Sequence, residues 1–147
     1  MAARSLGLVA LFLSLTLASG SALAEQQWPD LLGTWEGHTE AIASGNTTHA
    51  GSGDAETPRL VDTKFIIHVN HQVGKSFSGT IESEGTHGQK HHFVGTFTDG
   101  QHTAKVVDKS GVHEFHLIGK NEAKFCYTES YHDGHAIGCG SFHRLLQ

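Results

Sequence analysis

Histidine is the side chain type with the most chemical potential in this sequence, which has 13 histidines among 147 residues. Alternation along two predicted hairpins places His91, Asp108 and His113 on the inward face of a sheet, near one rim. Two imidazoles and a carboxylate can bind Zn²⁺ and leave a fourth coordination position open. These residues are therefore a candidate site for a metal or for haem. Two simpler arrangements also fit: Asp108 orients one neutral histidine, or all three groups are hydrated at the rim.

The sequence contains none of the common enzyme motifs. It lacks a Gly-x-Ser-x-Gly nucleophile elbow, a His-Glu-x-x-His motif and a glycine-rich phosphate loop. Serine, histidine and aspartate are abundant, but abundance alone specifies no geometry. The sequence favours a binding protein over an enzyme and assigns no catalytic residue.

Short β-strands are the elements that would position these side chains. Apolar and polar residues alternate in runs separated by glycine-containing turns, and no amphipathic helix is evident after the N-terminal segment. We expect an all-β fold, an eight-stranded antiparallel up-and-down barrel, because many short strands joined mostly by tight turns are typical of it. A β-sandwich is the competing fold, although it usually needs longer crossover connections. The expected strands lie near 33–43, 61–70, 75–83, 90–98, 102–108, 112–119, 122–130 and 135–146.

Two turns set the expected register of the central hairpins. Asp99-Gly100 is a strong hairpin signal because both residue types tolerate positive φ, and a turn centred there places Phe93 opposite Val106. A second turn near Ser110-Gly111 places Val106 opposite Phe115. Residues that lie opposite one another share a face of the sheet, so these pairs belong to one apolar face.

The two cysteines, Cys126 and Cys139, are expected to form a disulfide bond. An isolated pair in an exported chain is more often a disulfide than a pair of free thiols. A turn centred on His132-Asp133 places the two cysteines directly opposite each other on neighbouring strands, with the nearby aromatic residues on the other face.

Large apolar residues on the inward face offer the site that the sequence favours, so we expect a binding protein for a small apolar ligand, with the metal or haem site as an alternative. They suit a small apolar ligand held inside the barrel, since an eight-stranded barrel has room for one small ligand or for its own side chains. The same residues could equally pack a solid core. The candidate ligand-binding residues are Trp35, Phe65, Phe77, Phe93, Phe97, Phe115, Phe125 and Tyr127.

The N-terminal segment has the layout of a secretory signal peptide. Arg4 is followed by an apolar stretch over 6–17 and by the small-x-small cleavage site Ala22-Leu23-Ala24. We therefore expect a signal peptide over 1–24, a single barrel domain over 25–147, and export to the periplasm or the extracellular space. The mature chain would carry nine basic and fifteen acidic side chains, a net charge of −6. This balance argues against nucleic acid as a partner, and no later apolar run reaches membrane-spanning length.

A protein partner is a further alternative. The segment 44–60 is rich in turn-forming residues and has no hydrophobic period, and loops of this length often carry function. This segment, or the N-terminal tail over 25–29, could bind a protein such as a protease.

Residues at the two ends of the domain resemble a known superfamily. Gly33-Thr34-Trp35 opens the first expected strand, and Phe142-His143-Arg144-Leu145 closes the last. This pattern resembles the calycin superfamily, which includes lipocalins, fatty-acid-binding proteins and avidins. The resemblance implies that Arg144 packs over Trp35 at the closed end of the barrel. It also implies a ligand inside the barrel, although the further tryptophans that line the biotin site of avidins are missing. Bacterial metalloprotease inhibitors are similar in export, size and single disulfide, and they act through an N-terminal tail.

Overall fold

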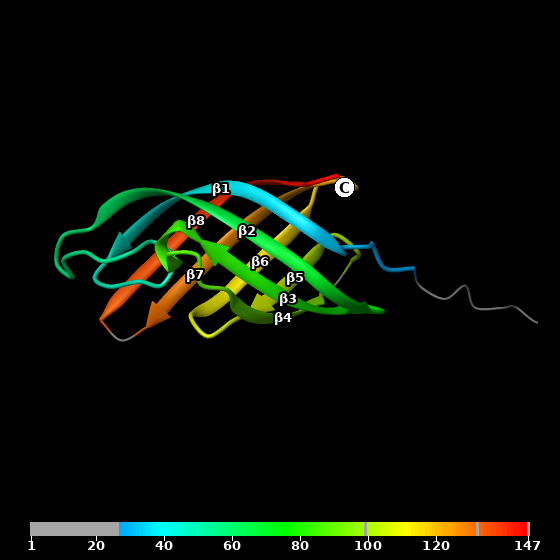
Figure 1. The fold of residues 1–147 in the computed structure, drawn as a ribbon, viewed down its shortest axis with the longest axis horizontal. Helices are drawn as coiled ribbons and strands as arrows, with labels where there is room; N and C mark the ends of the chain where they lie inside the picture. Colours follow the sequence, from blue (N-terminus) through cyan, green and yellow to red (C-terminus); the bar gives the residue numbers. More distant parts are fainter. Residues whose placement is uncertain (1–26, 99, 132, 147) are drawn as a thin grey trace, which may run out of the picture.

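The computed structural model describes residues 27–98, 100–131 and 133–146, which form a closed eight-stranded barrel (Figure 1). Each strand pairs antiparallel with its neighbours in sequence, and the first strand pairs with the last. The prediction of an all-β, eight-stranded antiparallel up-and-down barrel is therefore confirmed. The strands are β1 (Gly33–Ser44), β2 (Arg59–Val73), β3 (Ser76–Ser83), β4 (His91–Phe97), β5 (Thr103–Val107), β6 (Gly111–Leu117), β7 (Glu122–Tyr131) and β8 (Gly134–Arg144).

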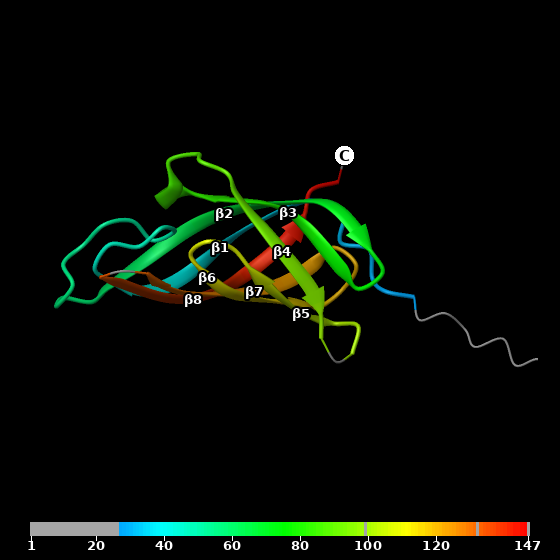
Figure 2. The same cartoon turned by 90° about the horizontal axis from the view of Figure 1, so that it is seen from below.

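Only one short helical turn, η1 (Glu84–Thr86), interrupts the strands in the described part of the chain. Among these residues no helix is long and apolar enough to cross a membrane. The predicted signal peptide over 1–24 lies outside the described residues. Figures 1 and 2 show that the β1–β2 connection, 45–58, lies at one end of the barrel and the start of β1 at the other. We call the first of these the loop end and the second the Trp35 end.

The pairing of the central strands differs from the expected register by two residues. Val106 lies opposite Gly95 instead of Phe93, and it lies opposite His113 instead of Phe115. The first turn is longer than a two-residue hairpin, because the Thr98 amide donates to the Thr103 carbonyl across it. A shift of two residues keeps every side chain on the same face of the sheet, so the predicted inward positions survive the error.

The Trp35 end is closed by packed side chains. Trp35 is fully buried, its indole N–H donates to the Leu31 carbonyl, and its ring meets Phe115 edge-on with centroids 5.1 Å apart. The Arg144 guanidinium lies 4.7 Å from the centre of the indole ring and also donates to the Asp30 carbonyl. The two Arg144 contacts are the ones that the resemblance to calycins implies.

The interior between the two ends is filled. All eight aromatic residues predicted to line a ligand site are buried, and many of their rings pack against one another. The void left between Leu31, Phe77, Phe93 and Phe125 has a volume of about 10 Å³. This volume is at the lower limit for a single water molecule. The inward aromatic residues therefore form a packed core in this structure.

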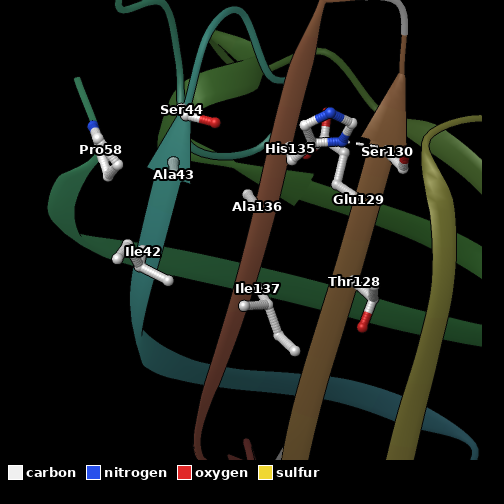
Figure 3. Close-up of a pocket in the computed structure, with 10 residues that line it drawn as sticks. All are labelled: Ile42, Ala43, Ser44, Pro58, Thr128, Glu129, Ser130, His135, Ala136 and Ile137. Carbon is white, nitrogen blue, oxygen red and sulfur yellow. Dashed lines mark hydrogen bonds between the residues drawn. The ribbon is translucent and has the colours of Figure 1, made fainter. Parts of the chain in front are cut away.

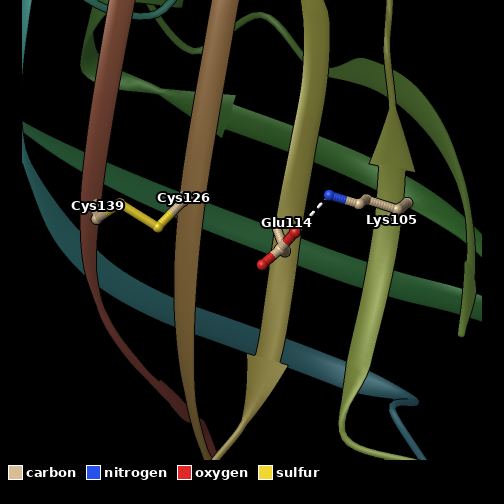
Figure 4. The surroundings of a disulfide bond; sticks show 4 residues. All are labelled: Lys105, Glu114, Cys126 and Cys139. Atoms are coloured by element: carbon tan, nitrogen blue, oxygen red, sulfur yellow. Dashed lines mark hydrogen bonds and ion pairs between the residues drawn. A yellow bond between two sulfur atoms is a disulfide. The ribbon is translucent and has the colours of Figure 1, made fainter. Parts of the chain in front are cut away.

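The predicted disulfide bond is confirmed. Cys126 and Cys139 lie directly opposite each other in the β7–β8 pair and are bonded on the outer face of the barrel (Figure 4). Glu114 of β6 lies opposite Cys126 on the outer face and forms an ion pair with Lys105 of β5. The bond thus joins neighbouring strands from outside and leaves the interior untouched.

Removal of this bond is expected to lower the free energy of unfolding without changing the fold. The double variant Cys126→Ser/Cys139→Ser should lose about 3 kcal/mol, because closing a loop of this length restricts the unfolded chain by that amount. Urea denaturation of both proteins tests the value, and the wild type in reductant should match the variant. A loss below about 1 kcal/mol would contradict it.

Candidate metal centre

Six polar side chains are buried together toward the loop end of the barrel. The strands explain five of them, because each occupies an inward position of a strand or, for Asp108, of the turn that directly follows β5. The sixth, His49, comes from the β1–β2 connection and is inserted between the strand ends. The six residues are His49, Ser83, His91, Asp108, His113 and Glu129.

Asp108 is the centre of this group. Its Oδ2 lies 3.2 Å from His49 Nε2, and its Oδ1 lies 3.2 Å from His113 Nε2, with all three side chains fully shielded from solvent. Oδ1 also accepts hydrogen bonds from the Ser110 amide at 2.7 Å, the Ser110 hydroxyl at 2.6 Å and the Gly111 amide at 3.0 Å. These bonds fix the carboxylate and leave Oδ2 directed at His49.

The same contacts keep Asp108 ionised. Burial alone would raise the pKa of this carboxyl, but its contacts with His113, His49 and Ser110 hold the pKa well below its usual range. The group therefore supplies a full negative charge inside the barrel. A buried charge of this kind needs a nearby cation to be stable.

His49 is oriented by Ser83. The Ser83 hydroxyl oxygen lies 3.1 Å from His49 Nδ1 and 3.4 Å from the His49 carbonyl oxygen, so it fixes the orientation of the imidazole ring. The other ring nitrogen, Nε2, faces the Asp108 carboxylate. The 3.2 Å between these two atoms is bridged either by a proton on Nε2 or by a metal ion.

His91 completes the convergence. One ligand atom from each of His49, His91 and Asp108 lies within 4.8 Å of the others. The pKa of His91 is lowered, first by burial and then by the charge of Lys109, which favours the neutral form that binds metals.

Several nitrogen atoms of the group have no hydrogen-bond partner among the described residues. They are Nδ1 of His91 and both ring nitrogens of His113. His113 Nε2 is near Asp108 Oδ1 but does not point along the line needed for a hydrogen bond. Buried polar atoms are nearly always paired, so unpaired ones in a polar cluster indicate that another atom belongs there.

The spacing of one pair of ligand atoms suits a tetrahedral ion. Two ligand atoms that each lie about 2.0–2.1 Å from such an ion are about 3.3–3.4 Å apart. The distance from His49 Nε2 to Asp108 Oδ2 is 3.2 Å. Ser83 holding Nδ1 of His49, and Ser110 holding Oδ1 of Asp108, are the outer contacts by which proteins usually orient metal ligands.

The structure brings the three predicted metal-site residues together and adds one that the sequence analysis missed. Asp108 lies beside His113, and His91 joins Asp108 through the group that includes His49. His49 falls in a connection without any period, so no register argument could place it. Its residue type was the only available signal. Glu129 was also missed, although alternation along β7 puts it inside the barrel.

Ser83, His49 and Asp108 also form a serine–histidine–carboxylate chain, the arrangement of many hydrolases. The Ser83 side chain is buried and contacts both the ring and the backbone carbonyl of His49, so its role here is to orient the imidazole. The geometry supports metal binding more directly than acyl transfer.

A shallow groove of about 470 Å³ lies over the ends of β1, β8 and β7 (Figure 3). The exposed side chains of Ile42 and Ile137 line it together with Pro58, and His135 and Ser130 lie at one end. Its lining includes none of the four converging metal-site residues, His49, His91, Asp108 and His113.

No protein-family model matches the chain, and comparisons with curated proteins and with solved structures give no match either.

Proposed function

We propose that this protein is an exported barrel that binds one divalent transition-metal ion near its loop end. His49 Nε2, His91 and Asp108 Oδ2 are the proposed ligands, and His113 stands beside them as a fourth. The observation that carries the proposal is the meeting of three buried imidazoles at a buried, ionised carboxylate, where His91 and His113 have ring nitrogens without a partner among the described residues.

The ligand types narrow the class of ion. Imidazole nitrogens with one carboxylate oxygen suit Zn²⁺, Cu²⁺ or Ni²⁺, whereas Ca²⁺ and Mg²⁺ prefer sites made of oxygen atoms. Both cysteines are used in the disulfide, so thiolate ligands are not available. Zinc is the natural first probe because it is usually held by four ligands in a tetrahedral arrangement, which matches the three ligands and His113.

The packed interior gives less support to an apolar ligand. A molecule in the central void of about 10 Å³ would have to displace several aromatic side chains. The polar centre already holds converging nitrogen and oxygen ligand atoms. Export is part of the proposal: the signal-peptide pattern over 1–24 predicts it, and a disulfide is typical of exported proteins. The closed barrel and the Trp35–Arg144 contact are compatible with a calycin-like origin.

Calorimetric titration of the mature, metal-free protein with Zn²⁺ tests the proposal. We expect one ion per chain, bound between His49 and Asp108. The double variant His49→Gln/His91→Gln should bind more than about 100-fold more weakly, because even outer contacts of metal ligands typically contribute 10- to 100-fold.

His135→Gln is the matched control, since His135 is exposed and pairs only with Ser130 among the described residues. It should bind zinc as the wild type does. Equal affinity in the wild type and in the double variant would show that surface histidines bind the metal and would contradict the proposal. A small apolar molecule retained in native mass spectra would instead favour the interior of the barrel.

A further inference from the structure

The proposed ligands are sealed from solvent in this structure. The side chains of His49, Asp108 and His113 have no exposed surface, and His91 is 7% exposed. An ion can therefore reach the centre only if part of the protein moves.

The barrel wall is unsuited to that movement. Every strand is hydrogen-bonded to a neighbour on both sides, so opening the wall would break two ladders at once. The β1–β2 connection, 45–58, is different, since few of its backbone groups bond to one another. Gly45 N donates to the Asp54 carbonyl and Thr47 N to the Gly51 carbonyl.

Two charged side chains hold this connection in place from opposite sides. The buried Glu129 carboxylate accepts hydrogen bonds from the backbone amides of Thr48 and His49. Arg59 donates to three backbone carbonyls, those of Gly45, Ala50 and Gly51, at 2.8–3.2 Å. Neither side chain is among the proposed metal ligands. Their contacts join the connection to β7 and β2.

We infer that the connection 45–58 is the gate of the metal centre, that its opening limits the exchange of the ion, and that Glu129 is the latch. The inference rests on the proposed function, because it concerns access to the same site. The connection supplies the ligand His49 and also covers the centre. The ion can therefore leave only when His49 moves away from it. The consequence is slow exchange, which suits a protein that retains its metal.

The latch makes a specific kinetic prediction. Glu129→Gln removes the charge from the two hydrogen bonds, and hydrogen bonds to charged groups are worth enough to change the opening equilibrium by about 10- to 100-fold. The closed forms with and without metal lose the same contact. The rates of zinc uptake and release should therefore both rise by that factor, while Kd stays within about threefold of the wild type.

Stopped-flow mixing with zinc and transfer of zinc to a chelator measure the two rates. Arg59→Gln removes the contacts that hold the connection from the side of β2, so it should also raise the rates of zinc uptake and release. This second variant keeps the test valid if Glu129→Gln folds poorly. Glu84→Gln is the matched control, because Glu84 is exposed at the loop end outside this connection. In the metal-free protein, the amides of Thr48 and His49 should exchange with deuterium faster in Glu129→Gln than in the wild type. In the control Glu84→Gln their exchange should be unchanged.

The outcomes separate the gate from the centre. If Glu129→Gln and Arg59→Gln both bind and release zinc at the wild-type rates, the proposal of a gate is wrong, while the proposal of a metal centre is unaffected. A rise in the release rate alone, with an equal rise in Kd, would also overturn the gate, because Glu129 would then belong to the site itself. If the wild type fails to bind zinc, the proposed metal centre and the proposed gate are both wrong.

Discussion

Asp108→Asn is expected to remove tight metal binding while the barrel stays folded. Asparagine keeps the shape of the side chain and can still accept the hydrogen bonds from the Ser110 and Gly111 amides. It loses the negative charge, however, and Asp108 is the only carboxylate among the four converging residues. Zinc affinity should fall more than about 1,000-fold, or about 4 kcal/mol, since each tenfold change is worth about 1.4 kcal/mol.

The metal-free variant should also be less stable, by about 2 kcal/mol, because hydrogen bonds to a charged group become hydrogen bonds to a neutral one. The pKa of Asp108 in the folded protein lies below its ordinary value. Its contribution is therefore fully present above about pH 4, where the unfolded chain is also ionised, and is lost on further acidification. Urea denaturation at pH 7 in a chelating buffer measures the difference.

Asp62→Asn is the control for this prediction. Asp62 also contacts a histidine, His38, at 3.0 Å, but the two side chains are 67% and 61% exposed. Exposed ion pairs contribute little, so the control should change neither zinc affinity nor stability by more than about 0.5 kcal/mol. An Asp108→Asn protein that binds zinc as tightly as the control would refute the role of the carboxylate.

The second large effect is expected at the other end of the barrel. Trp35→Ala should lower the free energy of unfolding by about 3–5 kcal/mol, because the variant leaves a cavity in the core. The Leu31 carbonyl also loses its hydrogen bond from the indole, and the Arg144 guanidinium loses its contact with the indole ring. This loss is a large part of the total stability of a typical small domain. Circular dichroism during urea denaturation measures it.

Two comparisons identify the cause. Trp35→Phe keeps most of the buried volume and should lose less than half as much. Trp28→Ala removes a partly exposed ring that stacks on Phe97 at 5.5 Å, and it should cost about 1 kcal/mol. Zinc affinity should be unchanged in the folded part of each sample, since Trp35 is not among the centre's contacts. A Trp35→Ala protein as stable as the wild type would show that Trp35 does not anchor this end.

Strand alternation made most of the fold predictable from the sequence. His91, Asp108 and His113 were placed on one inward face even though the assumed pairing was wrong by two residues, because a slip of two leaves the face unchanged. The error in the second turn has a visible cause. The Asp108 carboxylate binds the Ser110 and Gly111 amides and so centres the turn one residue earlier than expected.

The rest of the centre depends on contacts that leave no periodic signal. His49 reaches the centre because Glu129 and Arg59 hold a connection that has no regular structure. Each of these contacts joins a side chain to a backbone amide or carbonyl, and the Glu129 contact also spans most of the domain in sequence. The type of a residue does not specify which backbone group it will bind. The same holds for Ser83, whose hydroxyl is one of many in the chain and becomes special only beside His49.

The pairing of β1 with β8 has a consequence for how the chain could be rearranged. Trp35 lies opposite Arg144, and the Leu145 amide donates to the Thr34 carbonyl, so the two ends of the barrel sequence meet at the Trp35 end. The turn between β2 and β3, at Gly74, lies at the same end. A short peptide could join the two ends and new termini could be cut at that turn, giving a circular permutant with all eight strand pairs intact. In such a protein, or in one carrying a fusion partner at this end, the connection 45–58 would remain free to open.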